Sequence, residues 1–188
     1  MTRDEVIASA ATAIFGKPLV TNVYRSVIVE AIIAGALTDW TWCSADYAEH
    51  DFINADGMRL EVKQSAMKQT WVTKGEPKPS WDIAPRKQVW RDDRWVDAPG
   101  RNADIYVLAL HAVINDTADH REPSQWSFFV IPAYRLPASK RLSLPAAKLL
   151  VEPVAIDELP RAVGEAVAQA SAAERFTWKP GDLQVTMR

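Results

Sequence analysis

Two long apolar runs constrain the fold of this chain more than any other feature. The runs "ADIYVLALHAV" (residues 103–113) and "WSFFVIPAYRL" (126–136) are almost continuously apolar and rich in β-branched and aromatic residues. A strand with this composition is buried on both faces of its sheet. The polar segment between them, residues 115–125, is typical of a loop. The chain is therefore expected to build a sheet with these two strands at its centre.

Helices are predicted on either side of these strands in the sequence. Thr2 and Glu5 have the spacing of a capping box, which predicts a helix that ends near Gly16. A second helix is expected over about 21–37, and its segment "VIVEAIIAGAL" is apolar nearly all round, which predicts a buried helix. A C-terminal helix is expected over about 157–173. This order indicates an α/β (α+β) domain with a mixed β-sheet flanked by helices.

Composition narrows the functional classes. With 188 residues, 48% of them hydrophobic, the chain suits one domain. A net charge of -2 argues against whole-molecule attraction to nucleic acid or to an anionic membrane. Cys43 is the one cysteine, which excludes an intrachain disulfide and fits a cytoplasmic location. No run of about 18 uncharged apolar residues occurs, so we expect no transmembrane helix and no membrane partner.

The metal-binding options are narrowed in the same way. Three histidines and one cysteine do not have the spacing of a Cys/His zinc site. A metal ion in this protein would be held mainly by oxygen atoms, which favours Mg²⁺ or Mn²⁺.

The segment "DFINADGMRLEVKQSA" (residues 51–66) contains the main candidate site. Apolar and charged residues alternate from residue 58 onward, which predicts a strand, and Asp56 with Gly57 predicts a tight hairpin turn. Such a hairpin sets Asp51 opposite roughly 61–63, where Glu61 and Lys63 leave the same face. Two close carboxylates repel, and a divalent cation relieves that repulsion. The alternative is a cross-strand ion pair on an exposed hairpin, which contributes little to stability.

Glu30 is a further candidate because it lies inside the apolar helical segment. Burial of an unpaired carboxylate raises its pKa and costs free energy. We expect Glu30 to reach the same pocket and to bind or orient a metal-bound water. The alternative is that Glu30 pairs with Arg25 or Arg59, or opens to solvent.

A basic stretch follows the candidate site. Residues 39–58 contain no Lys or Arg, whereas residues 59–101 contain ten, against six Asp or Glu. Residues 73–102 are predicted to form a long, largely irregular excursion with one strand near 81–83. Its candidate phosphate contacts are Lys74, Lys78, Arg86, Lys87, Arg91, Arg94 and Arg101, and its candidate base-stacking residues are Trp71, Trp81, Trp90 and Trp95. The alternative is two solvated faces of opposite charge, with the tryptophans anchoring the loop in the core.

Taken together, these motifs resemble a known family. His50 and Asp51, a hairpin, and then "EVK" at 61–63 resemble the PD-(D/E)XK motif of the restriction-endonuclease-like nuclease superfamily, in a small bacterial branch. The helix with Glu30 resembles the one that often supplies an extra acidic residue there. Gln69 resembles the glutamine that some branches place after the lysine. The resemblance covers about residues 22–135. It departs from the family at His50, where proline is usual, and in the lack of an evident helix after residue 66.

The resemblance implies both a fold and an activity. It implies a single nuclease-like domain over 1–188, with a restriction-endonuclease-like core over about 22–135 and a C-terminal helical extension over about 155–175. Asp51 and Glu61 would be metal ligands, Glu30 an accessory carboxylate and ligand, Lys63 the catalytic lysine and Gln69 an accessory polar residue. The implied activity is Mg²⁺- or Mn²⁺-dependent endonucleolytic hydrolysis of phosphodiester bonds, with DNA as the expected partner.

Two further points stay open at this stage. The alternative function is a nucleic-acid-binding module of the same fold without catalysis. By analogy with duplex-cutting members of the family, residues 137–154 or the C-terminal helix are candidate contacts of a homodimer.

Overall fold

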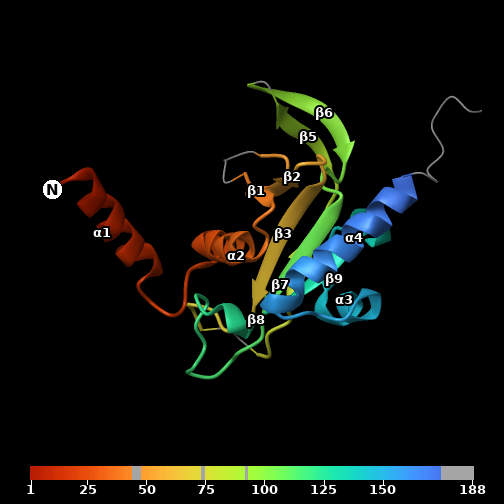
Figure 1. The fold of residues 1–188 in the computed structure, drawn as a ribbon. Helices are drawn as coiled ribbons and strands as arrows, with labels where there is room; N and C mark the ends of the chain where they lie inside the picture. The colour runs from red at the N-terminus through yellow and green to blue at the C-terminus, as the bar shows by residue number, and fades with distance from the viewer. Residues whose placement is uncertain (44–47, 73–74, 92, 175–188) are drawn as a thin grey trace, which may run out of the picture.

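The computed structural model describes residues 1–43, 48–72, 75–91 and 93–174 (Figure 1). The helices are α1 (Arg3–Phe15), α2 (Asn22–Ala36), α3 (Leu144–Leu150) and α4 (Leu159–Glu174), with a 3-10 turn, η3 (Ile156–Glu158), directly before α4. The strands are β1 (Trp40–Trp42), β2 (Phe52–Asn54), β3 (Arg59–Ala66), β4 (Ser80–Asp82), β5 (Arg86–Arg91), β6 (Arg94–Gly100), β7 (Ile105–His111), β8 (Trp126–Pro132) and β9 (Arg141–Ser143).

A five-stranded sheet with the order β1-β2-β3-β7-β8 forms the centre of the molecule. Strand β7 pairs in parallel with β3, from Leu60 opposite Ile105 to Ala66 opposite His111, and antiparallel with β8. The other neighbours, β1 with β2 and β2 with β3, are antiparallel. The predicted fold class, α/β with a mixed sheet flanked by helices, is confirmed. Both apolar runs of the sequence are strands, and every residue of β7 is buried.

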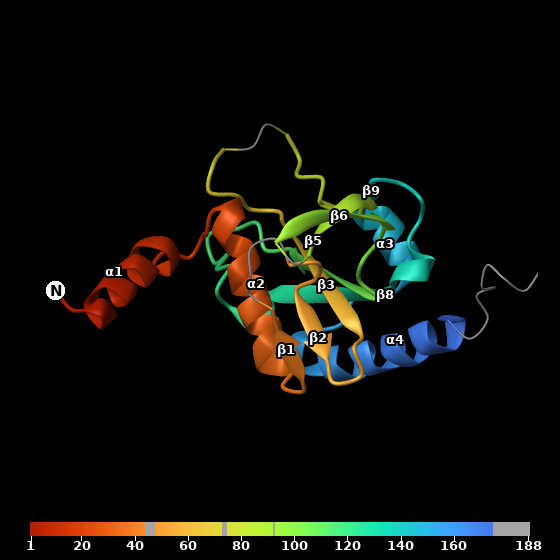
Figure 2. The same ribbon diagram turned by 90° about the horizontal axis from the view of Figure 1, so that it is seen from above.

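Each face of the sheet carries its own apolar layer, and the helices that cover the two faces can be followed in Figures 1 and 2. On one face, α2 and α4 pack their apolar stripes, including Ile33 and Val163, against Leu60 and Val107. The other face is covered by the short β4–β9 sheet and by α3, whose Ala147 belongs to the same cluster as residues of β7. This two-sided cover explains why β7 and β8 have no polar face.

The connection from β3 to β7 corrects part of the sequence prediction. A strand lies close to the expected position, as β4, but residues 86–91 and 94–100 are not irregular: they form the antiparallel strands β5 and β6, which we call the β5–β6 hairpin. No helix occurs between β3 and β7 in the described parts of residues 67–104. Trp81 is only 1% exposed and donates its Nε1–H to the carbonyl oxygen of Ala109 at 3.0 Å. Trp81 therefore anchors the connection to β7 and is not available to stack on a base.

The two N-terminal helices also refine the predictions. The capping box of α1 is present, since the Thr2 side chain accepts from the Glu5 amide and Glu5 accepts from the Thr2 amide. Helix α1 has no buried residue. The prediction that the segment 27–37 of this helix is buried all round is wrong, because only a stripe with Val29 and Ile33 is buried in α2 and Val27 is 41% exposed. None of the helices in the described residues is long and apolar enough to cross a membrane.

The edge of β3 determines where a site can form. The predicted hairpin is confirmed: β2 and β3 are antiparallel, with Gly57 at a φ of 79° in the turn. Strand β2 is short, and its pairing with β3 involves only Arg59 and Leu60 of that strand. The remainder of β3, from Glu61 onward, therefore has no paired strand on that side among the described residues. Helix α2 and strand β4 both contact β3 and flank this open edge.

A buried histidine ties the loop after β7 to two other segments. The amide of Val20 donates to His120 Nδ1 at 3.0 Å, so this nitrogen is unprotonated, and Nε2 lies 3.2 Å from the carbonyl oxygen of Lys68, to which it donates. Burial, followed by the charge of Arg25, lowers the pKa of His120 to about 4. Protonation of Nδ1 would remove its hydrogen bond with Val20.

This arrangement predicts acid sensitivity. Because the pKa of His120 is about 4 in the folded protein and 6.5 ordinarily, the unfolded chain binds more protons between these values, and stability is lost as pH falls through this window. This difference in the pKa of His120 corresponds to a loss of unfolding free energy on the order of 3 kcal/mol when the pH falls through the whole window. His120→Asn retains an acceptor for Val20 and should show a smaller loss of unfolding free energy between pH 7.5 and 4.5 in chemical denaturation. An equal loss in both proteins would contradict this assignment.

Candidate active site

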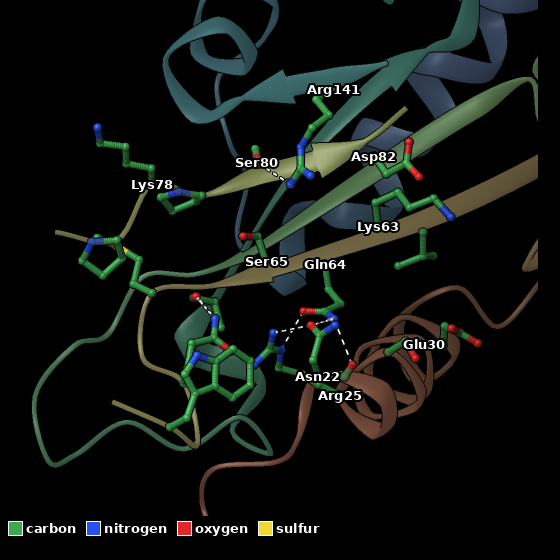
Figure 3. A pocket seen from close by; sticks show the side chains of 18 of the residues that line it. Asn22, Arg25, Glu30, Lys63, Gln64, Ser65, Lys78, Ser80, Asp82 and Arg141 are labelled. Atoms are coloured by element: carbon green, nitrogen blue, oxygen red, sulfur yellow. Dashed lines mark hydrogen bonds between the residues drawn. The ribbon is translucent and has the colours of Figure 1, made fainter. Parts of the chain in front are cut away.

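A cavity of about 620 Å³ opens at the free edge of β3, between α2 on one side and β4 and β9 on the other (Figure 3). Several residues selected from the sequence line it together: Glu30, Asp51, Lys63, Gln69 and Lys78. Glu61 is not part of the lining, but its carboxylate contacts the Lys63 ammonium. The structure thus gathers the predicted site residues from α2, β3 and the residue that precedes β2.

Asp51 is fixed by the end of the β2–β3 ladder. Its amide donates to the carbonyl oxygen of Leu60 at 3.0 Å, and its Oδ2 accepts from the amide of Val62 at 2.6 Å. Since Phe52 lies opposite Leu60, the register sets Asp51 opposite Glu61. The side chain of Asp51 thus takes the place of a strand neighbour for Val62, which holds one carboxylate oxygen at the open edge.

The carboxylates of the site are close enough to disturb one another. Burial, together with the negative charge of Glu61, raises the pKa of Asp51 to about 7, although the Val62 amide opposes this effect. Burial also raises the pKa of Glu30, against a hydrogen bond of 2.9 Å that Trp42 Nε1–H donates to Glu30 Oε2. Within the described residues Glu30 makes no ion pair with Arg25 or Arg59, so the structure does not support that alternative.

The donor set fits a hard divalent cation. The three carboxylates of Glu30, Asp51 and Glu61 are all oxygen donors, and among the described residues Lys63 is the only cation that forms an ion pair with one of them. Mg²⁺ and Mn²⁺ prefer such ligands. In the described part of the chain, however, no three His, Cys, Asp or Glu side chains are already grouped so that they could hold a metal ion. Glu61 is turned toward Lys63 and Glu30 toward Trp42, so binding would require these carboxylates to turn.

Sequence reasoning missed a polar network at the α2 end of the cavity. Arg25 is 1% exposed and donates to Gln64 Oε1 at 2.6 Å, Gln69 Oε1 at 3.0 Å and Asn22 Oδ1 at 2.7 Å. Gln64 Nε2 in turn donates to Asn22, and Gln69 Nε2 donates to the carbonyl oxygen of Ala66 at 2.5 Å. Gln69 therefore lines the cavity as expected, but its direct partners are Arg25 and the backbone.

The opposite wall of the cavity contains a second residue that the sequence did not indicate. Arg141, on β9, donates from Nη2 to Ser80 Oγ of β4 at 2.9 Å, and both residues line the cavity. Asp82, also on β4, lies on the same wall and accepts from the amide of Ala84 at 3.0 Å. The burial of Arg25 could have been predicted from its position four residues before Val29, on the same stripe of α2. The sequence contains no comparable signal for Arg141.

Several other candidate contacts to nucleic acid are on the β5–β6 hairpin rather than in the cavity lining. Arg86, Lys87 and Arg94 are exposed on the β5–β6 hairpin, and Arg91 ends β5. Lys74 lies outside the described residues. Arg101 donates to the carbonyl oxygens of Ile83 and Pro137, which gives it a structural role. The exposed tryptophans are Trp71 (55%), which lines the cavity, and Trp90 (37%) and Trp95 (54%) on the hairpin.

A scan against protein-family models and a search of curated proteins found no significant match. Among solved structures, this chain is similar to the bacterial homing endonuclease I-Ssp6803I, with a TM-score of 0.39, 20% sequence identity, and coverage of 84% of this chain and 99% of that chain. At this low TM-score, the likeness does not define the fold or the activity of this chain.

The electrostatics of Asp51 predict a stabilising substitution. Asp51→Asn keeps the acceptor for the Val62 amide but removes a negative charge that burial, Glu61 and Glu30 all disfavour. In EDTA at pH 8 its free energy of unfolding should exceed that of wild type by on the order of 1 kcal/mol. Thermal or chemical denaturation measures this difference.

The matched control is Asp56→Asn, which changes an exposed carboxylate on the same hairpin. Its unfolding free energy should change by less than about 0.5 kcal/mol. If Asp51→Asn were less stable than wild type in EDTA, the ionised Asp51 would be a stabilising structural group, and the account of the site would be wrong.

Proposed function

We propose that this protein is a metal-dependent nuclease that hydrolyses phosphodiester bonds, with DNA as its substrate. The observation that carries the proposal is the position of Asp51, Glu61 and Lys63 at the open edge of β3, with Glu30 lining the same cavity from α2. Acidic ligands for a cation, a lysine and an accessible cavity are what hydrolysis of a phosphodiester requires.

A place in the PD-(D/E)XK superfamily is part of the proposal. It is supported by the order of elements: helix α2 with Glu30, the antiparallel strands β1, β2 and β3, and then β7 parallel to β3. The absence of a helix between β3 and β7 in the described residues is a departure from the expected pattern. The β4–β9 sheet and α3 cover the face of the central sheet that such a helix would cover.

In this proposal Asp51 and Glu61 hold a Mg²⁺ or Mn²⁺ ion, and Glu30 acts as an accessory ligand. When bound, the ion supplies positive charge that activates water and stabilises negative oxygen atoms at phosphorus. Asp51 suits the role of ligand because its Oδ2 is fixed by the Val62 amide, so its position is preorganised.

Lys63 has a separate role in the proposed reaction. Its ammonium group contacts the carboxylates through an ion pair with Glu61. There it can donate a hydrogen bond to the attacking water or to a phosphate oxygen, and it stabilises the negative charge that grows on the phosphate in the transition state. Gln69 and Arg25 do not take part in bond breaking. Their hydrogen bonds hold the end of β3 against α2.

A cleavage assay tests this function. Labelled duplex and single-stranded DNA should be cut in Mg²⁺ or Mn²⁺ and remain intact in EDTA. Lys63→Ala should lower the rate at least about 100-fold, because a donor to the developing charge is lost. The matched control is Lys148→Ala, an exposed lysine on α3, which should cleave at the wild-type rate.

The outcomes separate the alternatives. Metal-dependent cleavage that survives Lys63→Ala would mean that the activity comes from another site or from a contaminant. Nucleic-acid binding without cleavage of either substrate in either metal would favour the binding module without catalysis. The same assay with RNA tests the choice of DNA.

A further inference from the structure

Three basic side chains line the cavity but have no part in the proposed hydrolysis. Arg25 lies on the α2 wall, and Lys78 and Arg141 lie on the wall formed by β4, β9 and the segment before β4. Figure 3 shows Arg141 and Ser80 on one side of the cavity, Asn22, Arg25 and Gln64 on the other, and Glu30 and Lys63 toward one end. The cavity therefore has an acidic end at Glu30 and Asp51 and a basic region on the β4–β9 wall, which also includes the carboxylate of Asp82, opposite Arg141 in the strand register.

The charge of Arg25 is not compensated. Its three hydrogen-bond partners are neutral amide oxygens, and no carboxylate of the described residues lies within ion-pair distance of it. Burial lowers the pKa of Arg25 to about 10, a value at which the guanidinium stays charged at neutral pH. A buried cation without a counter-ion costs free energy. Such a cost is reduced when an anion occupies the adjoining cavity.

The facing wall supplies donors for such an anion. Arg141 is exposed and makes no ion pair within the described chain, and neither does Lys78. Ser80 Oγ accepts from Arg141, so the hydroxyl hydrogen of Ser80 is free to donate into the cavity. Ser65, which also lines the cavity, has a half-buried side chain on β3. A planar guanidinium with hydroxyl and ammonium donors beside it is a common way to bind a phosphate group.

We infer that this basic region binds a second phosphate of the substrate, next along the strand to the phosphate that is cleaved. Arg141, Ser80 and Lys78 contact the phosphate directly, and Arg25 contributes positive charge from behind the opposite wall. This inference rests on the proposed function, since the scissile phosphate is taken to lie beside Asp51 and Lys63 in the same cavity. It makes the substrate a polymer with adjacent phosphodiesters rather than a single phosphate ester.

The test is a double-mutant cycle between Arg141 and one phosphate. The cleaved linkage is first mapped in Mg²⁺, and DNA is then made with a single neutral methylphosphonate at each neighbouring linkage in turn. Binding of each DNA to wild type and to Arg141→Ala is measured by fluorescence anisotropy in EDTA and again in Ca²⁺. Arg161→Ala, an exposed arginine on α4 outside the cavity, is the matched control.

For one neighbouring linkage, the methylphosphonate should weaken wild-type binding about 10-fold, and Arg141→Ala should weaken binding of unmodified DNA about 10-fold. The two changes together should weaken binding little more than either alone, because they remove the same contact. Arg161→Ala should bind like wild type. Arg141→Lys, which retains the charge but not the planar fork, should recover part of the loss.

Two results would overturn the inference while leaving the nuclease intact: Arg141→Ala that binds and cleaves like wild type, or methylphosphonate penalties equal in both proteins at every linkage. Failure of the proposed function looks different, because the wild-type protein would then leave the unmodified DNA uncleaved in either metal, whether or not it binds that DNA. Thermal denaturation of Arg141→Ala shows whether the variant is folded, and a melting temperature equal to that of wild type makes a loss of binding specific to the contact.

Discussion

The parallel pairing of β3 with β7 is the constraint on which the rest of the structure depends. Parallel neighbours cannot be joined by a tight turn, so the chain must return across one face of the sheet before it enters β7. The return, residues 67–104, is anchored where Trp81 packs into the second apolar cluster and donates to the Ala109 carbonyl. Because the return lies over this face, β4 is brought beside β3 and becomes one wall of the cavity.

The same sheet leaves room for charged groups at the edge of β3 beyond Leu60. Strand β2 ends its pairing at Leu60, so the charged half of β3 has α2 and β4 as neighbours instead of another strand. Asp51 and Arg25 are held there at an electrostatic cost, shown by a raised pKa for the carboxyl and a lowered pKa for the guanidinium. The two apolar layers of the sheet offset this cost, as is common where a site stores unfavourable charge.

The sequence predicts the parts of the structure in which neighbouring residues carry the signal. The apolar runs identify β7 and β8, and the alternation around Leu60 and Val62 identifies β3, whose turn then brings Asp51 to Glu61 and Lys63. Glu30 was found because a carboxylate is unusual in an apolar helix. Its hydrogen-bond partner Trp42 was not predicted, because β1 has only three residues, too few to show an alternating pattern.

The remaining features depend on pairings between distant segments. Arg141 reaches the cavity only because β9 pairs with β4, and both strands are too short for a periodic pattern. The β5–β6 hairpin was hidden by its Arg, Asp and Pro content, although Val89 and Val96 lie opposite each other as in an ordinary ladder. The exposure of the outer face of α2 was not predicted, because the sequence shows that this face is apolar but not whether another element covers it.

The most direct measurement is a crystal structure of the protein with Mn²⁺, with the ion located by its anomalous scattering. The account predicts one strong anomalous peak between the carboxylates of Asp51 and Glu61, near Glu30, with the Glu61 carboxylate turned away from Lys63. The same crystals of Glu61→Gln should lack the peak. A peak elsewhere, or none at Mn²⁺ concentrations that support cleavage, would contradict the central claim that these carboxylates form a metal site.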